Sequence, residues 1–318
     1  MDIVLTGSVA YDYLMTFPGS FKEYILADKL EHISLSFLVD GMVKRRGGIA
    51  PNIAYTLALL GGKARVMATV GQDFADYRAK LEAVGVDTAL MKVIPDVFTA
   101  SFFCNTDQSN AQIASFYPGA MDHAGELSFH DLEKKPDWVV ISPNSPDSMV
   151  KYPQECNELD IPYIYDPSQQ IPRMTGEDLR LGVERASALM VNDYEFELIL
   201  KQTGMTETEI REGLQFMVIT RGEEGASIYV DDEEIRTPVV PPTEIVDPTG
   251  VGDAFRGGFL TGFSLGFDWA ICGKMGALAA TYCLESMGTQ EHSYTPDEFV
   301  SRFRKNFDDN GTLDVLKG

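Results

Sequence analysis

The sequence predicts an α/β protein with a doubly wound, mainly parallel sheet, helices on both faces and a small β-strand lid. From about residue 132 to residue 222, apolar runs alternate with amphipathic stretches at the spacing of βαβ units, which form parallel sheets covered on both sides. Residues 3–7 are a short apolar run closed by glycine, typical of a buried strand. Residues 15–44 instead alternate aromatic and β-branched residues with polar ones, which favours exposed strands.

After the first strand, the first half of the chain alternates between helical and extended patterns. Gly47-Gly48 precede a stretch with apolar residues at helical spacing, and Gly61-Gly62 end it. A polar turn between the last two strands of this half predicts a hairpin that meets the lid. The expected elements are a helix at 49–60, a strand at 64–71, a helix at 73–85, and strands at 98–105 and 111–117.

The second half continues this alternation and ends in helices. An antiparallel hairpin is expected at 226–230 and 233–240, and a strand is expected to end at Val246 before a glycine-rich turn. The strands expected in the parallel sheet are 137–142, 161–166, 187–192 and 215–222. The helices expected are one after Pro146, then 176–186, 193–202, one beginning near Val251, and 269–286. We assign residues 1–14, 42–94 and 119–318 to the α/β core, and residues 15–41 and 95–118 to a discontinuous β lid.

The charge balance excludes two classes of partner. The chain has 318 residues, with 48 Asp and Glu against 26 Lys and Arg, so its formal net charge is −22. Nucleic acid phosphates and anionic lipids repel such a surface, so we expect neither nucleic acid nor a membrane as a partner. If the substrate is a polyanion, a local feature must overcome this repulsion.

The cysteines and the first residues favour a soluble, cytoplasmic protein. The four cysteines have no CxxC or zinc-finger spacing, which is typical of free thiols in a reducing cytosol. Residues 1–10 lack the basic start of a signal peptide. No uncharged apolar run in the sequence reaches the roughly 18 residues that a membrane span requires.

The glycine-rich turn DPTGVGD, at residues 247–253, is the strongest indication of chemistry. Backbone N–H groups at such a turn join the positive end of the following helix and form an anion site that needs no lysine. Gly250 and Gly252 carry no Cβ atom that would hold a phosphate away. Asp253 lies in the first helical turn, where a carboxylate can accept a proton from an attacking hydroxyl. Its alternative role is to stabilise the helix dipole.

Three separated blocks resemble the ribokinase-like (PfkB) family of carbohydrate and nucleoside kinases, over essentially the whole chain. They are GSVAYD at residues 7–12, GGIAPNIA at residues 47–54 and DPTGVGD at residues 247–253. The third block is the most specific, although Val251 stands where the family more often has alanine. The resemblance implies the ribokinase-like fold and ATP-dependent transfer of a phosphoryl group to an alcohol group.

The resemblance also implies roles for the residues that match these blocks. Asp253 would be the general base, and the amides of Gly250, Val251 and Gly252 would form the anion hole for the transferred phosphoryl group. Asp12 would bind sugar hydroxyls, since one carboxylate accepts from two adjacent hydroxyls; otherwise it is a turn residue. The residues implied in substrate binding are Ser8, Asp12, Gly47, Gly48, Asn52, Gln112 and Phe116.

Further elements resemble the parts of the family that approach ATP. Asn192 and Glu195 match an N-x-x-E element that places Mg²⁺ and phosphate through water, and their spacing is also that of a helix capping box; both roles are compatible. In the T-x-G-x-x-G turn at 220–225, Arg221 is either a phosphate contact or a solvated surface cation. The residues implied in ATP binding are Asn192, Glu195, Thr220, Arg221, Gly222, Gly225 and Thr249. The resemblance also allows K⁺ beside Asp247 and Thr249.

The sequence leaves the substrate open between two classes. Residues 111–121 and 166–172 look like segments of prokaryotic adenosine and nucleoside kinases. The lid also contains aromatic residues, which either face a purine or build a small core of the lid itself. We expect ATP-dependent phosphorylation of a nucleoside 5′-hydroxyl, with adenosine first. A sugar kinase of the ribokinase or fructokinase type is the alternative, and a non-catalytic nucleotide-binding sensor or scaffold is the remote one.

Two surface features of the lid region have open roles. Lys44-Arg45-Arg46 directly precede the glycine pair, and they either attract phosphate or form a solvated strand end. The exposed edges of the lid strands favour pairing with a second copy of the chain, which would give a homodimer.

Overall fold

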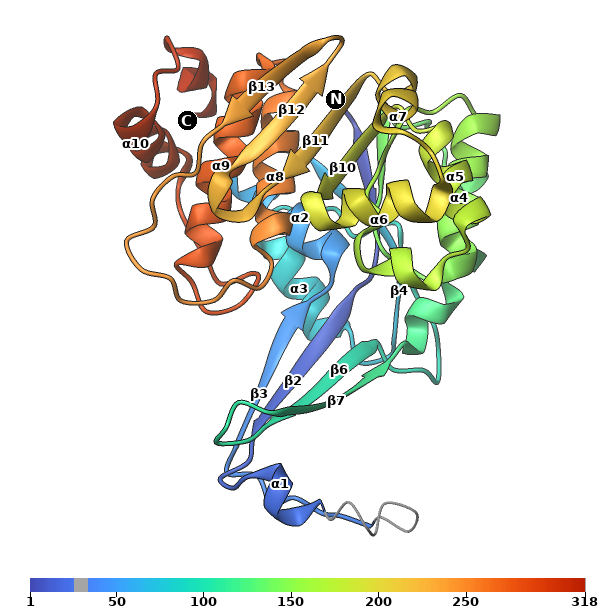
Figure 1. Cartoon of the computed structure of the whole chain (residues 1–318), viewed down its shortest axis with the longest axis vertical. Helices are drawn as coiled ribbons and strands as arrows, with labels where there is room; N and C mark the ends of the chain where they lie inside the picture. The colour runs from blue at the N-terminus through green and yellow to red at the C-terminus, as the bar shows by residue number, and fades with distance from the viewer. Residues whose placement is uncertain (26–33, 318) are drawn as a thin grey trace.

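A large sheet lies between two layers of helices, and a smaller sheet projects from one end of this core (Figure 1). The computed structural model describes residues 1–25 and 34–317. Residues 26–33 of the predicted lid lie outside the described residues. The fold class is the one that the sequence predicts.

The large sheet has nine strands in the order β13-β12-β11-β10-β9-β8-β1-β4-β5. Neighbours from β5 to β11 are parallel, whereas β12 and β13 are antiparallel. The chain order reverses at β1, which has β4 on one side and β8 on the other, and ligands bind doubly wound sheets beyond the carboxyl ends of strands at such a point. The strands are β1 Ile3–Thr6, β4 Ala64–Val70, β5 Met91–Val93, β8 Trp138–Ile141, β9 Tyr163–Tyr165, β10 Ala188–Asn192, β11 Phe216–Thr220, β12 Ala226–Val230 and β13 Glu233–Thr237.

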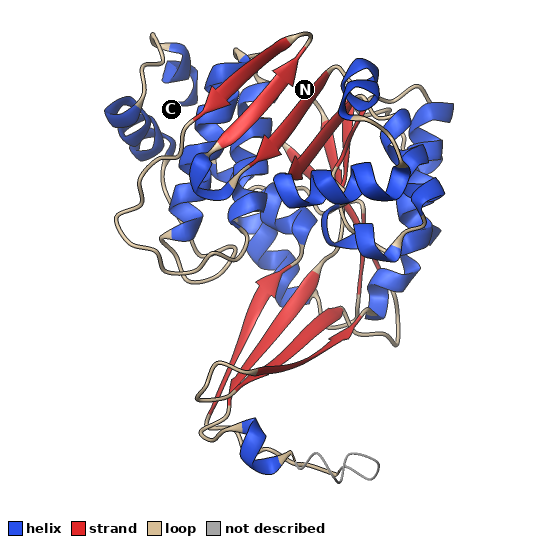
Figure 2. Ribbon diagram, viewed as in Figure 1, coloured by secondary structure: helices blue, strands red, loops and turns tan. Residues whose placement is uncertain are grey.

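Helices cover both faces of this sheet because successive side chains of its central strands point to opposite sides (Figure 2). Ile3 and Leu5 are buried in the layer formed with α2, α3, α8 and α9, and Val4 is buried in the layer formed with α4, α5, α6 and α7. The helices are α2 Ile49–Leu59, α3 Ala75–Ala83, α4 Pro146–Glu158, α5 Gly176–Glu184, α6 Asp193–Thr203, α7 Glu207–Gly213, α8 Val251–Ser264, α9 Trp269–Leu284 and α10 Pro296–Asn306.

The smaller sheet has the strand order β3-β2-β6-β7. Its strands are β2 Ala10–Thr16, β3 Gly41–Gly47, β6 Ala100–Thr106 and β7 Gln112–Tyr117. Strands β6 and β7 form the predicted antiparallel hairpin, and β2 lies parallel to β6. Strands β2 and β3 include residues 10–14 and 42–47, which we assigned to the core. The smaller sheet therefore contains more residues near the core than the predicted lid does. At its tip, the rings of Phe17, Phe21 and Phe37 pack together beside the short helix α1 (Phe21–Tyr24).

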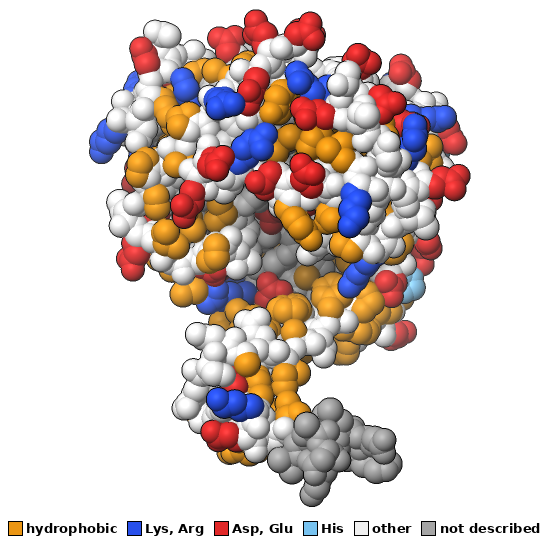
Figure 3. Space-filling view, viewed as in Figure 1, with side chains coloured by type: hydrophobic (Ala, Val, Ile, Leu, Met, Phe, Trp, Pro, Cys, Tyr) orange, Lys and Arg blue, Asp and Glu red, His pale blue; other side chains and the backbone are white. Residues whose placement is uncertain are grey.

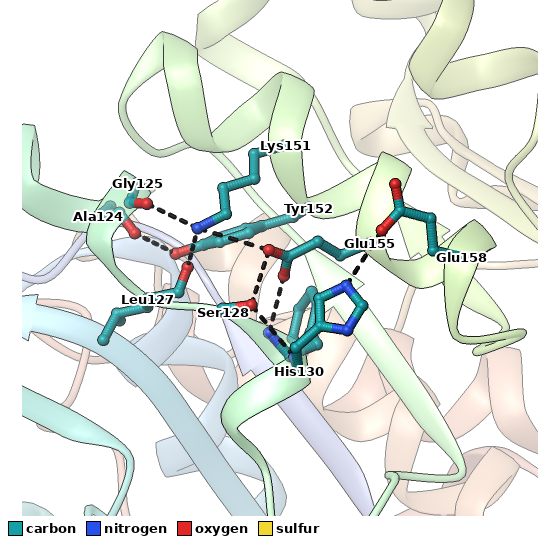
Figure 4. Close-up of polar contacts among 10 residues, drawn as sticks. Ala124, Gly125, Leu127, Ser128, His130, Lys151, Tyr152, Glu155 and Glu158 are labelled. Carbon is teal, nitrogen blue, oxygen red and sulfur yellow. Dashed lines mark hydrogen bonds and ion pairs between the residues drawn. The ribbon is translucent and has the colours of Figure 1, made fainter.

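The segment after β7 is fastened to helix α4 (Figure 4). It forms the 3₁₀ helices η2 (Gly119–Glu126) and η3 (Phe129–Asp131). Lys151 donates hydrogen bonds of 2.8 Å to two backbone carbonyls of this segment. The buried carboxylate of Glu155 accepts from the Ser128 hydroxyl and the Phe129 amide, each at 2.8 Å. One end of the smaller sheet is therefore anchored to a core helix.

The prediction of a strand that ends at Val246 is wrong. The segment between β13 and α8 contains no strand, since Pro241-Pro242 offer no N–H groups for a ladder. The amides of Val246 and Asp247 instead donate to the carbonyl of Leu284, at the end of α9. Helices α7 and α10 were not predicted, although Thr206 with Glu209 and Thr295 with Glu298 form capping boxes at their starts.

The cysteines are free and buried, as the sequence predicts. Among residues 1–25 and 34–317, no helix is both long and apolar enough to cross a membrane.

Candidate active site

The glycine-rich turn leads directly into helix α8. Gly250 is its N-cap residue, in the left-handed conformation with φ 77°, and a Cβ atom there would lie 2.7 Å from Cγ2 of Thr289. A side chain would therefore meet both backbone strain and a clash. The N–H groups of the first helical turn have no intrahelical acceptor, and with the helix dipole they form a site for an anion.

Asp253 is the third residue of α8 and is half-buried. The side-chain amide of Asn52 donates a 2.8 Å hydrogen bond to its Oδ2 atom. Burial raises the pKa of Asp253 from 3.8 to about 7, although the nearby charge of Arg256 and the Asn52 hydrogen bond oppose this. The carboxyl group therefore changes between its protonated and proton-accepting forms near neutral pH.

The glycine pair brings the start of α2 close to strand β2. A Cβ atom on Gly47 would lie 2.8 Å from Oδ2 of Asp12, and one on Gly48, whose φ is +98°, would overlap the carbonyl oxygen of Ser8. The hydroxyl of Ser8 accepts a 3.3 Å hydrogen bond from the amide of Ile49, the first residue of α2. Burial raises the pKa of Asp12, against the effect of the Arg45 charge. We call Ser8, Asp12, Gly47 and Gly48 the glycine cradle.

Aromatic residues of the smaller sheet share a face with Asp12. In the strand register, Asp12 lies opposite Arg45 on β3 and opposite Phe102 on β6, and Phe102 lies opposite Phe116 on β7. Directly opposed residues project from the same face of a sheet. Gln112 is on this face too, but it pairs with Thr106, about 13 Å farther along the strands at about 3.3 Å per residue. The surface is hollowed where this sheet meets the core (Figure 3).

Asn192 and Glu195 form the capping box of helix α6. Asn192 Oδ1 accepts from the amide of Glu195 at 2.7 Å, and Glu195 Oε2 accepts from the amide of Asn192 at 2.8 Å. The Ser168 hydroxyl donates to the other oxygen of Glu195 at 2.9 Å. The carboxylate is thus fixed at the carboxyl end of β10, and each of its oxygens retains a lone pair for a water molecule of a hydrated cation.

The turn at Thr220, Arg221, Gly222 and Gly225 follows strand β11. Gly222 and Gly225 have positive φ angles of 53° and 89°, so the predicted glycine-dependent turn is present. The guanidinium of Arg221 donates to the Ser227 hydroxyl at 3.4 Å and to the Tyr229 hydroxyl at 3.2 Å. Arg221 is therefore directed along β12 in this conformation.

Asp247 is enclosed by donors. Its Oδ1 accepts from the amide of Thr249 at 2.9 Å, and its Oδ2 accepts from the amide of Gly288 at 3.0 Å and from Arg45 at 3.1 Å. Although burial opposes it, the hydrogen bonds from Thr249 and Gly288 and the charge of Arg45 lower the pKa of Asp247. A guanidinium already neutralises this carboxylate, so these residues do not fit K⁺ in this conformation.

The other residues of the basic cluster also have partners. The Lys44 ammonium lies 3.6 Å from the centre of the Tyr11 ring, and Arg46 forms a 3.2 Å ion pair with Glu291.

Among the described residues, His, Cys, Asp and Glu side chains form no group of three or more that could hold a metal ion.

Two sets of buried residues at the site have contacts that the sequence does not predict. Arg256, one helical turn after Asp253, forms a 2.7 Å ion pair with Asp166 at the end of β9. Burial raises the pKa of Asp166 to about 6 despite this partner. An arginine within an otherwise apolar helix was the available signal, because a buried arginine requires an acceptor. Gln290 and Tyr77 form the second set and contact Asn52 and Gly47.

Comparison with known proteins agrees with this geometry. The ligand-free nucleoside kinase of Burkholderia thailandensis superposes with a TM-score of 0.87, at 40% identity, over 95% of this chain and 99% of its own. Its complex with inosine gives a TM-score of 0.85 at 38% identity, over 96% and 98%. The nucleoside kinase of Methanocaldococcus jannaschii is 27% identical over 305 residues, 95% of this chain and 97% of that protein.

A family model matches most of the chain as well. The model is that of the pfkB family carbohydrate kinases, and it matches residues 9–296. This range includes Asp12, Gly47 and Gly48 of the glycine cradle, the capping box at Asn192 and the turn before Asp253. The family consists of kinases, which transfer a phosphoryl group to a hydroxyl, and it implies ATP as the donor. The chain belongs to the pfkB family of carbohydrate kinases and is a phosphotransferase of the ribokinase-like fold.

Proposed function

We propose that this kinase phosphorylates the 5′-hydroxyl of a nucleoside, with adenosine first among its substrates. The observation that carries the proposal is the position of Asp253, a carboxylate held by Asn52 at the start of helix α8. Asn52 belongs to the same helix start as the glycine cradle, where Asp12 can accept hydrogen bonds from ribose hydroxyls. One hydroxyl of a bound sugar would then lie between a proton acceptor and an anion site.

In the proposed reaction, Asp12 and Asn52 hold the ribose while Asp253 takes the proton of the 5′-hydroxyl. The freed oxygen bonds to the γ-phosphorus of ATP, the bond from that phosphorus to the β,γ-bridging oxygen breaks, and ADP leaves. The amides of Gly250, Val251 and Gly252 stabilise the charge on the transferred group. Backbone donors of this kind allow a chain with a net charge of −22 to bind a polyanion.

Two observations favour a nucleoside over a free sugar. The rings of Phe102 and Phe116 project from the same face as Asp12, where they can pack against a base attached to the ribose. The similar proteins of B. thailandensis and M. jannaschii are named nucleoside kinases, and inosine is bound to the former. The alternative, a free-sugar kinase, is favoured by the ribokinase of Bacillus subtilis, which is 25% identical over 93% of this chain.

We place ATP beyond the carboxyl ends of β10 and β11. The residues proposed to line this side are Asn192, Glu195, Thr220, Arg221, Gly222, Gly225 and Thr249. Glu195 and Asn192 fit Mg²⁺ held through water, since Mg²⁺ usually retains several water molecules and is bound by one or two carboxylates plus phosphates. Bound there, Mg²⁺ would neutralise phosphate charge. Arg221 must leave Ser227 and Tyr229 to contact a phosphate.

The test is release of ADP from ATP in the presence of adenosine, inosine, cytidine, ribose or fructose, each with Mg²⁺ and with a chelator. We expect turnover with nucleosides, adenosine foremost, and loss of turnover with the chelator. Turnover only with free sugars would overturn the nucleoside proposal. The panel is repeated with K⁺ replaced by tetramethylammonium, and we expect no change because Arg45 already neutralises Asp247.

We also propose that two copies of the chain associate through the smaller sheet. The face opposite Asp12 carries exposed apolar residues: Phe103 is 39%, Ile113 42% and Met42 64% exposed. Burying such a patch stabilises an interface by about 25 cal/mol per Å² of apolar surface. Light scattering with size-exclusion chromatography should give a dimer mass, and Ile113→Lys should give a monomer. A monomeric wild type would refute the proposed dimer.

The cytoplasmic location of the protein stays a prediction.

A further inference from the structure

The loop that follows helix α9 contacts several parts of the active site in succession. The amide of Gly288 donates to Asp247 at 3.0 Å, and the hydroxyl of Thr289 donates to the carbonyl of Arg46 at 3.1 Å. The next side chains are those of Gln290 and Glu291, and Glu291 pairs with Arg46. This loop, residues 288–291, thus lies against the glycine-rich turn and against the end of strand β3. None of its residues was singled out from the sequence.

Gln290 is only 1% exposed, and its side-chain amide makes two hydrogen bonds. Its Nε2 atom donates to Oδ1 of Asn52 at 2.8 Å and also donates to the hydroxyl of Tyr77. That hydroxyl in turn donates to the carbonyl of Gly47 at 2.9 Å. A side-chain amide has two N–H groups, so these two bonds use both of them.

This arrangement fixes the orientation of the Asn52 amide. Because Oδ1 of Asn52 accepts from Gln290, its Nδ2 must be the atom that faces Asp253, to which it donates at 2.8 Å. A rotated Asn52 amide would set its oxygen against the Asp253 carboxylate and its NH₂ against the Gln290 NH₂. Both contacts would be repulsive, so Gln290 selects the rotamer that supports the carboxylate.

We propose that Gln290 is a positioning residue that connects the base to the sugar site: through Asn52 it holds Asp253, and through Tyr77 it holds Gly47 in the glycine cradle. The inference rests on the proposed function only in that Asp253 accepts the proton of the substrate hydroxyl. It does not depend on whether that hydroxyl belongs to a nucleoside or to a free sugar. The tests therefore use whichever acceptor the wild-type enzyme phosphorylates.

Three substitutions separate this role from simple filling of space. Gln290→Met keeps the length of the side chain but removes both donors, and we expect kcat to fall about 10- to 100-fold, the scale of a displaced catalytic group, with little change in KM for ATP. Gln290→Glu is closer in shape but cannot donate, and it should lower kcat further because it favours the wrong Asn52 rotamer. Gln202→Met, at the far end of helix α6, is the matched control and should keep wild-type kcat. Thermal unfolding of each variant identifies any loss of folding.

A double-mutant cycle tests whether Gln290 acts through Asn52. In an Asn52→Ala background, Gln290→Met should lower kcat by less than about threefold, since residues that act as a unit are not additive. Tyr77→Phe leaves the Asn52 contact in place, so it should raise KM for the acceptor more than it lowers kcat. The proposal is overturned if folded Gln290→Met and Gln290→Glu retain kcat, if Gln290→Glu is the milder change, or if the Asn52 and Gln290 effects multiply. If the wild type phosphorylates only free sugars, the nucleoside proposal fails while these expectations stand.

Discussion

Replacing Asp253 by asparagine should separate catalysis from folding. Asparagine has nearly the same shape, and its side-chain oxygen can still accept the hydrogen bond that Asn52 donates to Asp253 at 2.8 Å. An amide NH₂ group then replaces the other carboxylate oxygen, and it cannot take a proton from the substrate. We expect kcat to fall about 10²- to 10⁴-fold, the scale on which a general base contributes, with little change in substrate binding.

The same substitution should stabilise the folded protein at alkaline pH. The folded-state pKa of Asp253, about 7, lies above its ordinary value of 3.8, so folding favours the protonated form. In the wild type, the unfolded state loses its proton from Asp253 at a lower pH than the folded state does. The free energy of unfolding therefore falls as the pH rises between 3.8 and about 7. About three pH units at about 1.36 kcal/mol each correspond to about 4 kcal/mol. Because the side chain is only half-buried, solvent screening reduces the gain expected from Asp253→Asn to about 2–4 kcal/mol at pH ~8.

Two measurements test this reasoning. Calorimetry should show a rise in Tm of about 3–6 °C at pH ~8, given about 2.1 cal/mol/K of unfolding entropy per residue, and almost no rise at pH ~4. ADP release gives kcat at neutral pH. Asp232→Asn, at an exposed position, is the control and should change neither quantity. A variant with near-normal turnover would refute the role of Asp253 as the base. A rise in Tm that is equal at both pH values would refute the linkage to its ionisation.

Three further predictions follow from the geometry. The acid limb of kcat/KM should have its midpoint near pH 7, because burial raises the pKa of Asp253 to about 7 and only the ionised form accepts a proton; a midpoint near 4 would contradict this. Gly48→Ala should lower the free energy of unfolding by more than about 1 kcal/mol in urea titrations, since φ is +98° and a Cβ atom would overlap the Ser8 carbonyl; unchanged stability would refute the strain. Glu155→Gln should cost about 1–3 kcal/mol of stability with kcat unchanged, because an amide replaces a buried carboxylate that accepts from Ser128 and Phe129; an unchanged Tm would show that the anchor contributes nothing.

The catalytic turn could be predicted from sequence because all its parts are contiguous. Gly250, Gly252 and Asp253 lie within four residues, and the property that matters, free amides at a helix start, follows from that local pattern. The alternation of strands and helices was readable for the same reason. The expected strand before this turn failed because Pro241-Pro242 prevent a ladder, a local signal that outweighed the apolar residues after it.

The partners that support the turn could not be predicted because the chain brings them from far away. Arg256 and Asp166 are 90 residues apart, and Gln290 and Asn52 are 238 apart. Neither pair has a spacing that sequence periodicity reports, and a glutamine or a tyrosine is not by itself a sign of an active site. Only the folded chain brings the end of β9 to helix α8, and the loop after α9 to the start of α2.

Asp12 lies near the base of the smaller sheet, so a rotation of this sheet would move it much less than the tip. Measured along strand β2 from its first residue, Ala10, Asp12 lies about 7 Å away and Thr16 about 20 Å away, at about 3.3 Å per residue. A rotation of about 10° at the base would move the tip by about 3.5 Å but Asp12 by only about 1 Å, and about 1 Å is the scale on which catalytic alignment is gained or lost. A large movement at the tip would therefore change the distance between Asp12 on the sheet and Asp253 on the core only slightly. A contact that holds the tip in place would also fix this distance.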